Sequence, residues 1–141
     1  MVSDSVKRWM LASLKANIVL AQAVGGASSI KSASGELPVS TGVYLAVTDD
    51  QRRGESHRFV SASIYIVAES EGLAHRIAEL ISQALAFVPG KSSAPGLPIS
   101  TYGMRSLRLA RNQTYSPPDR IEDSALYAAR MDYEIIAAAT S

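Results

Sequence analysis

The sequence has no cysteine and only two histidines among its 141 residues. The missing thiol excludes cysteine nucleophiles, disulfide bonds and cysteine metal ligands, so stability must come from packing or from neighbouring subunits. A metal site built on two histidines would need carboxylates to complete it. We therefore expect a chain that works without a metal or another cofactor.

Long apolar runs are also missing. The run ANIVLAQAVGG, residues 16–26, is too short to span a bilayer. It also lacks the basic start and the small-residue cleavage pattern of an export signal. We expect a soluble, unexported chain that makes no contact with a membrane.

The chain also lacks a strong net charge. The 14 Lys and Arg residues nearly balance the 13 Asp and Glu residues, which gives a formal net charge of +1. No global field therefore draws the protein to nucleic acid or to an anionic membrane, and any charge effect must be local. Because 47% of the residues are hydrophobic, the chain can build one sizeable core, and we expect a single domain over residues 1–141.

Motifs for catalysis or phosphate binding are absent as well. No serine lies in a G-x-S-x-G elbow, and VGGASS lacks the lysine and the preceding strand of a phosphate-binding loop. His75 and Glu79 lie one helical turn apart, which could begin a metal site, but an ordinary solvated pair on a helix surface explains them better. We expect a protein that is not an enzyme.

The first part of the chain predicts a helix and then a strand. Apolar residues recur at helical spacing from Ser3 to the helix-ending pair Gly25 and Gly26, which indicates one helix of about five turns. Its stripe comprises Val6, Met10, Leu14, Ile18 and Ala21. Residues 27–38 are small and polar and predict a long exposed loop. The β-branched stretch VSTGVYLAV predicts a strand, and TDDQRRGESH predicts the hairpin loop after it.

The stretch RFVSASIYIVAESEGLAHRIAELISQAL, residues 58–85, changes its apolar period from two to 3.6. This change predicts a strand that runs directly into a helix, with Ser70 as the N-cap and Pro89 and Gly90 as the end. The buried strand face should hold Val60, Ala62, Ile64, Ile66 and Ala68, and the buried helix stripe should hold Leu73, Ile77, Leu80, Ile81, Ala84 and Leu85.

The last part predicts two more strands. Leu107 and Leu109 alternate with Ser106 and Arg108, whereas residues 112–123 contain two prolines and predict a turn. Residues 124–140 are rich enough in alanine for a helix, but their clean alternation favours a strand. The predicted fold class is α+β, with a four-stranded, mostly antiparallel sheet, helices packed on one face, and the element order α-β-β-α-β-β.

Arginines gather near both predicted hairpins. Such clusters can contact phosphates, but acidic residues interleave both of them, which favours solvated strand edges with salt bridges. The arginines are Arg52, Arg53, Arg105, Arg108, Arg111 and Arg120, and the acids are Asp49, Asp50, Glu55, Asp119, Glu122 and Asp123. Trp9 could anchor an interface, although its place beside the helical stripe favours the core.

The element order and several local stretches resemble the tail-terminator family of long-tailed bacteriophages, which also occurs in phage-derived gene transfer agents. The stretches are the first helix ending in AVGG, the strand GVYLAV, the run SHRFVSASIYIVAESEGLAHRIAELISQAL, and the strands MRSLRLARNQTY and ALYAARMDYEII. The resemblance covers most of the chain. It implies a virion protein, assembled in the host cytoplasm, that forms a homohexameric ring on the head-proximal end of the tail tube.

Such a ring would stop polymerisation of the tail tube protein, bind the head-tail connector protein, and let DNA pass through its lumen without sequence-specific binding. The family offers no catalytic residues. The residues that we expect in the lumen or at an interface are Arg52, Arg53, Arg108 and Arg111, and an interface loop should contain Asp49, Asp50, Glu55 and His57. Two alternatives stay open: another phage neck or head-completion protein, and a small ligand-binding protein or enzyme that uses the polar groups near His57, His75 and Glu79.

Overall fold

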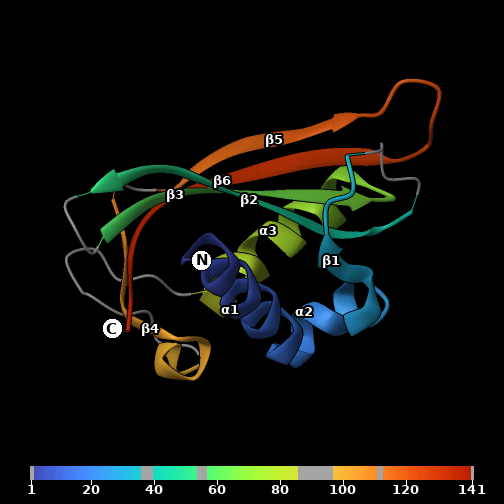
Figure 1. The fold of residues 1–141 in the computed structure, drawn as a ribbon. Helices are drawn as coiled ribbons and strands as arrows, with labels where there is room; N and C mark the ends of the chain where they lie inside the picture. Colours follow the sequence, from blue (N-terminus) through green and yellow to red (C-terminus); the bar gives the residue numbers. More distant parts are fainter. Residues whose placement is uncertain (1, 36–39, 54–56, 86–96, 111–112, 141) are drawn as a thin grey trace.

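In the computed structural model the described residues are 2–35, 40–53, 57–85, 97–110 and 113–140 (Figure 1). Their elements, in chain order, are α1 (Val2–Ala16), α2 (Ile18–Ala23), the 3-10 turn η1 (Ala27–Ser29), β1 (Ile30–Ser32), β2 (Gly42–Arg53), β3 (His57–Ala68), α3 (Glu71–Leu85), the 3-10 turn η2 (Ile99–Tyr102), β4 (Met104–Leu109), β5 (Thr114–Arg120) and β6 (Tyr127–Ala139).

The strands form one six-stranded sheet in the order β1-β2-β3-β6-β4, with β5 also paired to β6. Only β1 pairs in parallel, so the sheet is mixed but mostly antiparallel. All three α-helices lie on the same side of the sheet (Figure 1). The α+β class and the one-sided helical layer are confirmed, whereas the expected number of four strands is wrong because β1 and β5 are also present.

The strand β1 lies where the sequence predicts a loop. Ile30 is fully buried, Lys31 is exposed, and their backbone pairs in parallel with Val43 and Tyr44 of β2. A strand of three residues is too short to show a period of two, and its partner lies 13 positions further along the chain. Pairing to β2, together with burial of Ile30, supplies the stability that local sequence does not indicate.

The strand β5 replaces the predicted proline turn. Its pairing with β6 is interrupted between Ser116 and Asp119, and Pro117 and Pro118 fall in this irregularity. A proline cannot donate a ladder hydrogen bond, so it is tolerated in edge strands and at bulges. The two prolines therefore mark an irregular edge strand here, and the turn follows only after Arg120.

The predicted first helix is broken in two. Asn17 has extended backbone dihedrals, and its side-chain oxygen accepts from the amide of Leu20 at 2.9 Å, which makes it the N-cap of α2. The break turns Leu20 into the core and leaves Ile18 72% exposed. The expected stripe is therefore correct through Leu14 and wrong at Ile18.

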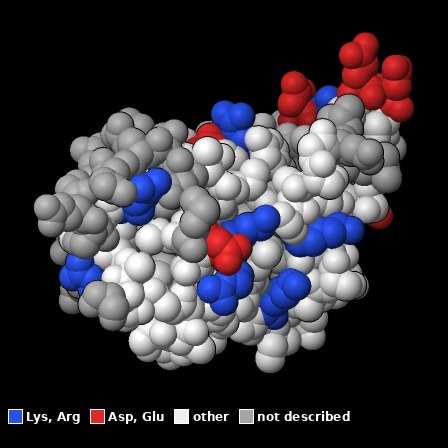
Figure 2. Space-filling model, in the orientation of Figure 1, with Lys and Arg blue, Asp and Glu red and all other residues white. Residues whose placement is uncertain are grey.

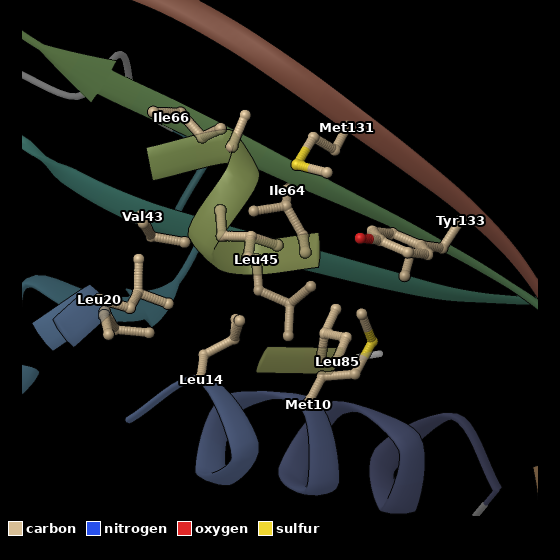
Figure 3. Close-up of a cluster of buried hydrophobic side chains, with 14 of the residues drawn as sticks. Met10, Leu14, Leu20, Val43, Leu45, Ile64, Ile66, Leu85, Met131 and Tyr133 are labelled. Carbon is tan, nitrogen blue, oxygen red and sulfur yellow. The ribbon is translucent and has the colours of Figure 1, made fainter. Parts of the chain in front are cut away.

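The run from β3 into α3 follows the predicted pattern. The five alternating residues from Val60 to Ala68 are all buried, and Ser70 accepts from the amide of Leu73 at 3.1 Å as the N-cap of α3. The core lies between these strands and the helices, as the labelled side chains in Figure 3 show. Trp9 is fully buried and donates from Nε1 to the carbonyl oxygen of Leu97 at 2.7 Å, so it belongs to the core. Residues 127–139 form a strand, as their alternation favours.

The loop predicted over residues 48–57 is mostly strand. The strand β2 continues to Arg53, β3 begins at His57, and Arg53 pairs with His57. The pairing shifts between Asp49 and Gln51, which indicates a bulge. Among the described residues, one edge of β2 pairs with β3, and its other edge pairs only with the short β1, at Val43–Leu45. The end of β2 near Arg53 is therefore an open sheet edge, and charged residues suit such an edge.

Candidate functional surfaces

The sheet face opposite the helices carries a ladder of polar contacts between β3 and β6. Ser61 Oγ donates to Glu134 Oε2 at 3.0 Å, and Ser63 Oγ donates to Asp132 Oδ1 at 2.7 Å. Arg130 Nε donates to Asp132 Oδ2 at 3.1 Å. These residues occupy alternate positions, so they share the outer face while Val60, Ala62 and Ile64 fill the core.

An open groove of about 430 Å³ runs over this ladder and is also lined by Thr114. Hydroxyl donors and Arg130 already use carboxylate oxygens of Asp132 and Glu134. Within the described residues, no group of three His, Asp or Glu side chains could hold a metal ion. The groove is therefore a polar surface on which Asp132 and Glu134 are already hydrogen-bonded within the chain.

The expected arginine sites gather at one end of the sheet. Arg52 and Arg53 end β2, and Arg108 is exposed in β4 opposite Ile136 of β6. Because β3 and β6 lie between β2 and β4, the backbone of Arg108 on β4 is three strand spacings, about 14 Å, from the backbone of Arg52 on β2. The structure also places Arg58, opposite Arg52, at this end. Arg58 directly follows the predicted hairpin loop in the sequence, but we did not include it among the expected lumen or interface residues.

The structure says less about four other expected positions. Arg111 and Glu55 lie outside the described residues, and for Asp49 and Asp50 the structure describes the backbone alone. His57 is the first residue of β3, half-buried, and pairs with Ala138 as well as with Arg53. The described backbone of the expected interface loop therefore consists of the last residues of β2 and the first residue of β3, at the arginine end of the sheet.

The two histidines are far apart in the fold. His75 lies on α3, where its Nδ1 is 2.8 Å from the hydroxyl oxygen of Tyr115 on β5. Glu79 instead pairs with Arg76, with 3.6 Å between Oε2 and Nη1. The structure therefore does not bring His57, His75 and Glu79 together as one polar site.

One tyrosine hydroxyl lies inside the core. Tyr133 is 1% exposed, and its hydroxyl lies close to Ser82, whose Oγ accepts from Gln113 Nε2 at 2.8 Å. Burial raises the pKa of Tyr133 well above its usual value, because the ionised phenolate would lose its hydration. These contacts join α3, β6 and the start of β5, so the hydroxyl has a structural role.

Acidic side chains gather at the opposite end of the sheet, at the turn between β5 and β6. The end of β5 and this turn hold Asp119, Glu122 and Asp123, which are all exposed, with Arg120 as the single basic residue. Figure 2 shows several red side chains together at this projecting end, whereas most of the blue ones on this face lie elsewhere. The sequence suggested that acids and arginines interleave. The fold separates Arg105 and Arg108, which lie on β4, from Asp119, Glu122 and Asp123, whereas Asp49 and Asp50 stay beside Arg52 and Arg53 on β2.

The helical layer has an outer face of a different kind. On α1, Lys15 is exposed, and Arg8 Nε pairs with Asp4 Oδ2 at 3.2 Å. Next to Lys15, the apolar residues Ile18 and Val19 of α2 are 72% and 51% exposed. Exposed apolar residues of this size beside basic ones are typical of a contact surface.

These observations describe an α+β domain with a rigid core, two projecting strand pairs and several polar or charged contact surfaces. No helix of the described residues is long and apolar enough to cross a membrane. No family model matches the sequence, and no curated protein sequence matches it.

A solved structure does share the fold. One chain in the structure described as "Virion of native gene transfer agent (GTA) particle" superposes with a TM-score of 0.56 over 96% of this chain and 95% of that chain, at 19% sequence identity. Nearly the full length of both chains takes part. The similarity shows that this chain has the fold of a gene transfer agent virion component.

Proposed function

We propose that this chain is a structural subunit of a phage-like virion, and that it is the tail terminator. In this role it forms a ring on the head-proximal end of the tail tube, stops polymerisation of the tube protein and joins the tail to the head connector. The observation that carries the proposal is the shared fold with a gene transfer agent virion chain over 96% of this chain. The resemblance of the sequence to tail terminators adds the specific role.

The surfaces described above support a role in assembly. The core is closed on the helical side of the sheet, while Ser61, Ser63, Arg130, Asp132 and Glu134 make a polar stretch on the outer face. Charged residues lie at both ends of the sheet. A ring subunit needs such a rigid body with projecting elements that reach its neighbours. Catalysis would need convergent groups with a shaped pocket, and the groove on the outer face offers carboxylates that are already hydrogen-bonded within the chain.

The arginine end of the sheet is our proposed lumen surface. In a ring of six copies, Arg52, Arg53 and Arg108 would each repeat six times around a channel that DNA crosses. A chain with a net charge of +1 supplies only weak phosphate attraction, which suits DNA in transit because tight contacts would hold it. DNA is thus a passing partner that is bound without sequence preference.

The test is to delete the gene from a strain that produces the particles and to image what remains. We expect tails of abnormal, variable length that are not joined to heads, and complementation with the intact gene should restore both properties. Tails of normal length that merely fail to join heads would assign the chain to another neck position. In parallel, electron microscopy of the purified chain should show a sixfold ring with a central hole, whereas a monomer with a closed pocket would favour a ligand-binding protein.

A further inference from the structure

Two surfaces of the chain complement each other in charge and in apolar content. The first, the α1–α2 face, comprises Lys7, Arg8 and Lys15 with Ile18 and Val19. The second, the hairpin tip, comprises residues 119–126, which are the end of β5 and the turn to β6. Neither surface is used by the core, and the hairpin tip lies at the end of the sheet opposite the arginines (Figure 1).

The charges of the two surfaces are opposite. The α1–α2 face has three basic residues and one acid, Asp4, which gives a net charge of +2. The hairpin tip has three acids and one base, Arg120, which gives −2. Arg120 is held within the tip, because its Nε donates to the carbonyl oxygen of Ser124 at 2.9 Å. The carboxylates of Glu122 and Asp123 therefore dominate the outward end of the turn.

The apolar residues of the two surfaces match as well. Ile18 is 72% and Val19 is 51% exposed, and the two are neighbours at the start of α2. The hairpin tip offers Ile121 and Leu126, both half-buried, and the exposed Ala125. A contact that covers Ile18 and Val19 with such residues gains apolar burial, and the surrounding charges orient it.

The two surfaces cannot readily meet within one chain. Both α1 and β5 pack against α3, and the turn after β5 projects away from the helices (Figure 1). Asp123 has a positive φ of 58°, and Arg120, Ser124 and Leu126 are hydrogen-bonded within the turn, so its shape is fixed. A fixed turn that carries the complement of a face elsewhere on the same chain forms a head-to-tail contact with a second copy, and such contacts repeat.

We propose that the hairpin tip of one copy docks on the α1–α2 face of the next copy, with Glu122 and Asp123 facing Lys7 and Lys15 and with Ile18 and Val19 covered. This inference rests on the proposed function, because it supplies the contact between neighbours in the ring. The occupant is a second copy of this chain, since the complementary surface is present on the chain itself.

The absence of native cysteine makes a direct test possible. A chain with Val19→Cys and Ala125→Cys, both at exposed positions, is treated with a short bismaleimide, once in purified particles and once as free protein at up to about 1 mM, where even weak contacts are populated. We expect a ladder of covalent oligomers. The matched control keeps Val19→Cys but replaces the second site by Gln83→Cys, on the exposed side of α3, and should stay monomeric.

Charge reversal tests the pairing itself. Replacing Glu122→Lys with Asp123→Asn, or Lys7→Glu with Lys15→Glu, should each weaken association about tenfold, since like charges then face each other. Asparagine is chosen at position 123 because it tolerates the positive φ. The chain with all four changes restores opposite charges and should associate within about threefold of the parent. Circular dichroism and thermal melting confirm that each variant is folded.

The outcomes separate this contact from the proposed function. Absence of a ladder in both particles and free protein overturns the contact, and so does an equal ladder from the control or a four-change chain that associates no better than either parent variant. A sixfold ring without the ladder would overturn the contact and leave the terminator in place. A ladder from a chain that is absent from the particles, with normal tails after gene deletion, would keep the contact and reject the terminator.

Discussion

Replacing Leu80→Ala tests the side of α3 that the fold buries. Leu80 is 2% exposed and lies between Ile77 and Ile81 on a helix that packs against α1, β3 and β6. The substitution removes three buried carbon groups, which costs about 2.4 kcal/mol at about 0.8 kcal/mol each. Because packing on three sides limits collapse of the cavity, the loss in the free energy of unfolding should reach about 3 to 5 kcal/mol.

The assay for this prediction is urea denaturation followed by circular dichroism, with the m-value compared between variants. We expect a lower midpoint at an unchanged m-value, and a melting temperature lower by about 6 to 15 °C. Gln83→Ala, on the exposed side of the same helix, is the control and should change the free energy of unfolding by less than about 0.5 kcal/mol. A Leu80→Ala variant as stable as this control would refute the inward orientation of the stripe.

Three further predictions concern the helix break, the buried phenol and DNA. Ile18→Ser should change the free energy of unfolding by less than about 0.5 kcal/mol, whereas Leu20→Ala should lower it by about 2 to 5 kcal/mol; equal effects in urea would reject the break at Asn17. Because the pKa of Tyr133 is raised in the folded state, the folded chain keeps the phenol proton to a higher pH than the unfolded chain does. The contribution of Tyr133 to the free energy of unfolding is therefore complete below the unfolded pKa of about 10, and it falls as the pH rises above that value. The urea midpoint of Tyr133→Phe should therefore fall less than that of the parent between about pH 9 and 11, and parallel losses would contradict this. The isolated chain should bind DNA weakly, with strong salt dependence and no sequence preference in mobility-shift assays, whereas nanomolar binding to one site in physiological salt would indicate a regulator.

Local sequence predicts the parts of this fold whose stability is local. The alternation of β3, the N-cap at Ser70 and the stripe of α3 all follow from periods that only a few neighbouring residues define. The strand β1 was not predictable in this way, because Ile30–Ser32 depends on a partner at Val43–Leu45. The strand β5 contains two prolines, so its pairing depends on an irregular edge that local rules disfavour.

The candidate surfaces also divide into features that local sequence predicts and features that depend on how distant segments come together. Sequence places Arg52, Arg53 and Arg108 near turns, and the topology then collects them at one sheet end. The separation of acids from bases at residues 119–123 was missed, because it depends on how far the β5–β6 turn lies from β2, β3 and β4. The exposure of Ile18 was missed for a similar reason, since a helical period continues through Asn17 in sequence while the backbone does not.

The long strand β6 has a mechanical consequence. One of its edges pairs with β3 from Ala68 opposite Tyr127 to His57 opposite Ala138, and its other edge is divided between β5 and β4. A pull on the turn at residues 121–126 therefore loads β6 along its length. Because antiparallel hydrogen bonds lie perpendicular to the strands, such a load shears the whole ladder at once and does not peel it bond by bond. A subunit held by this turn would resist tension with most of its sheet.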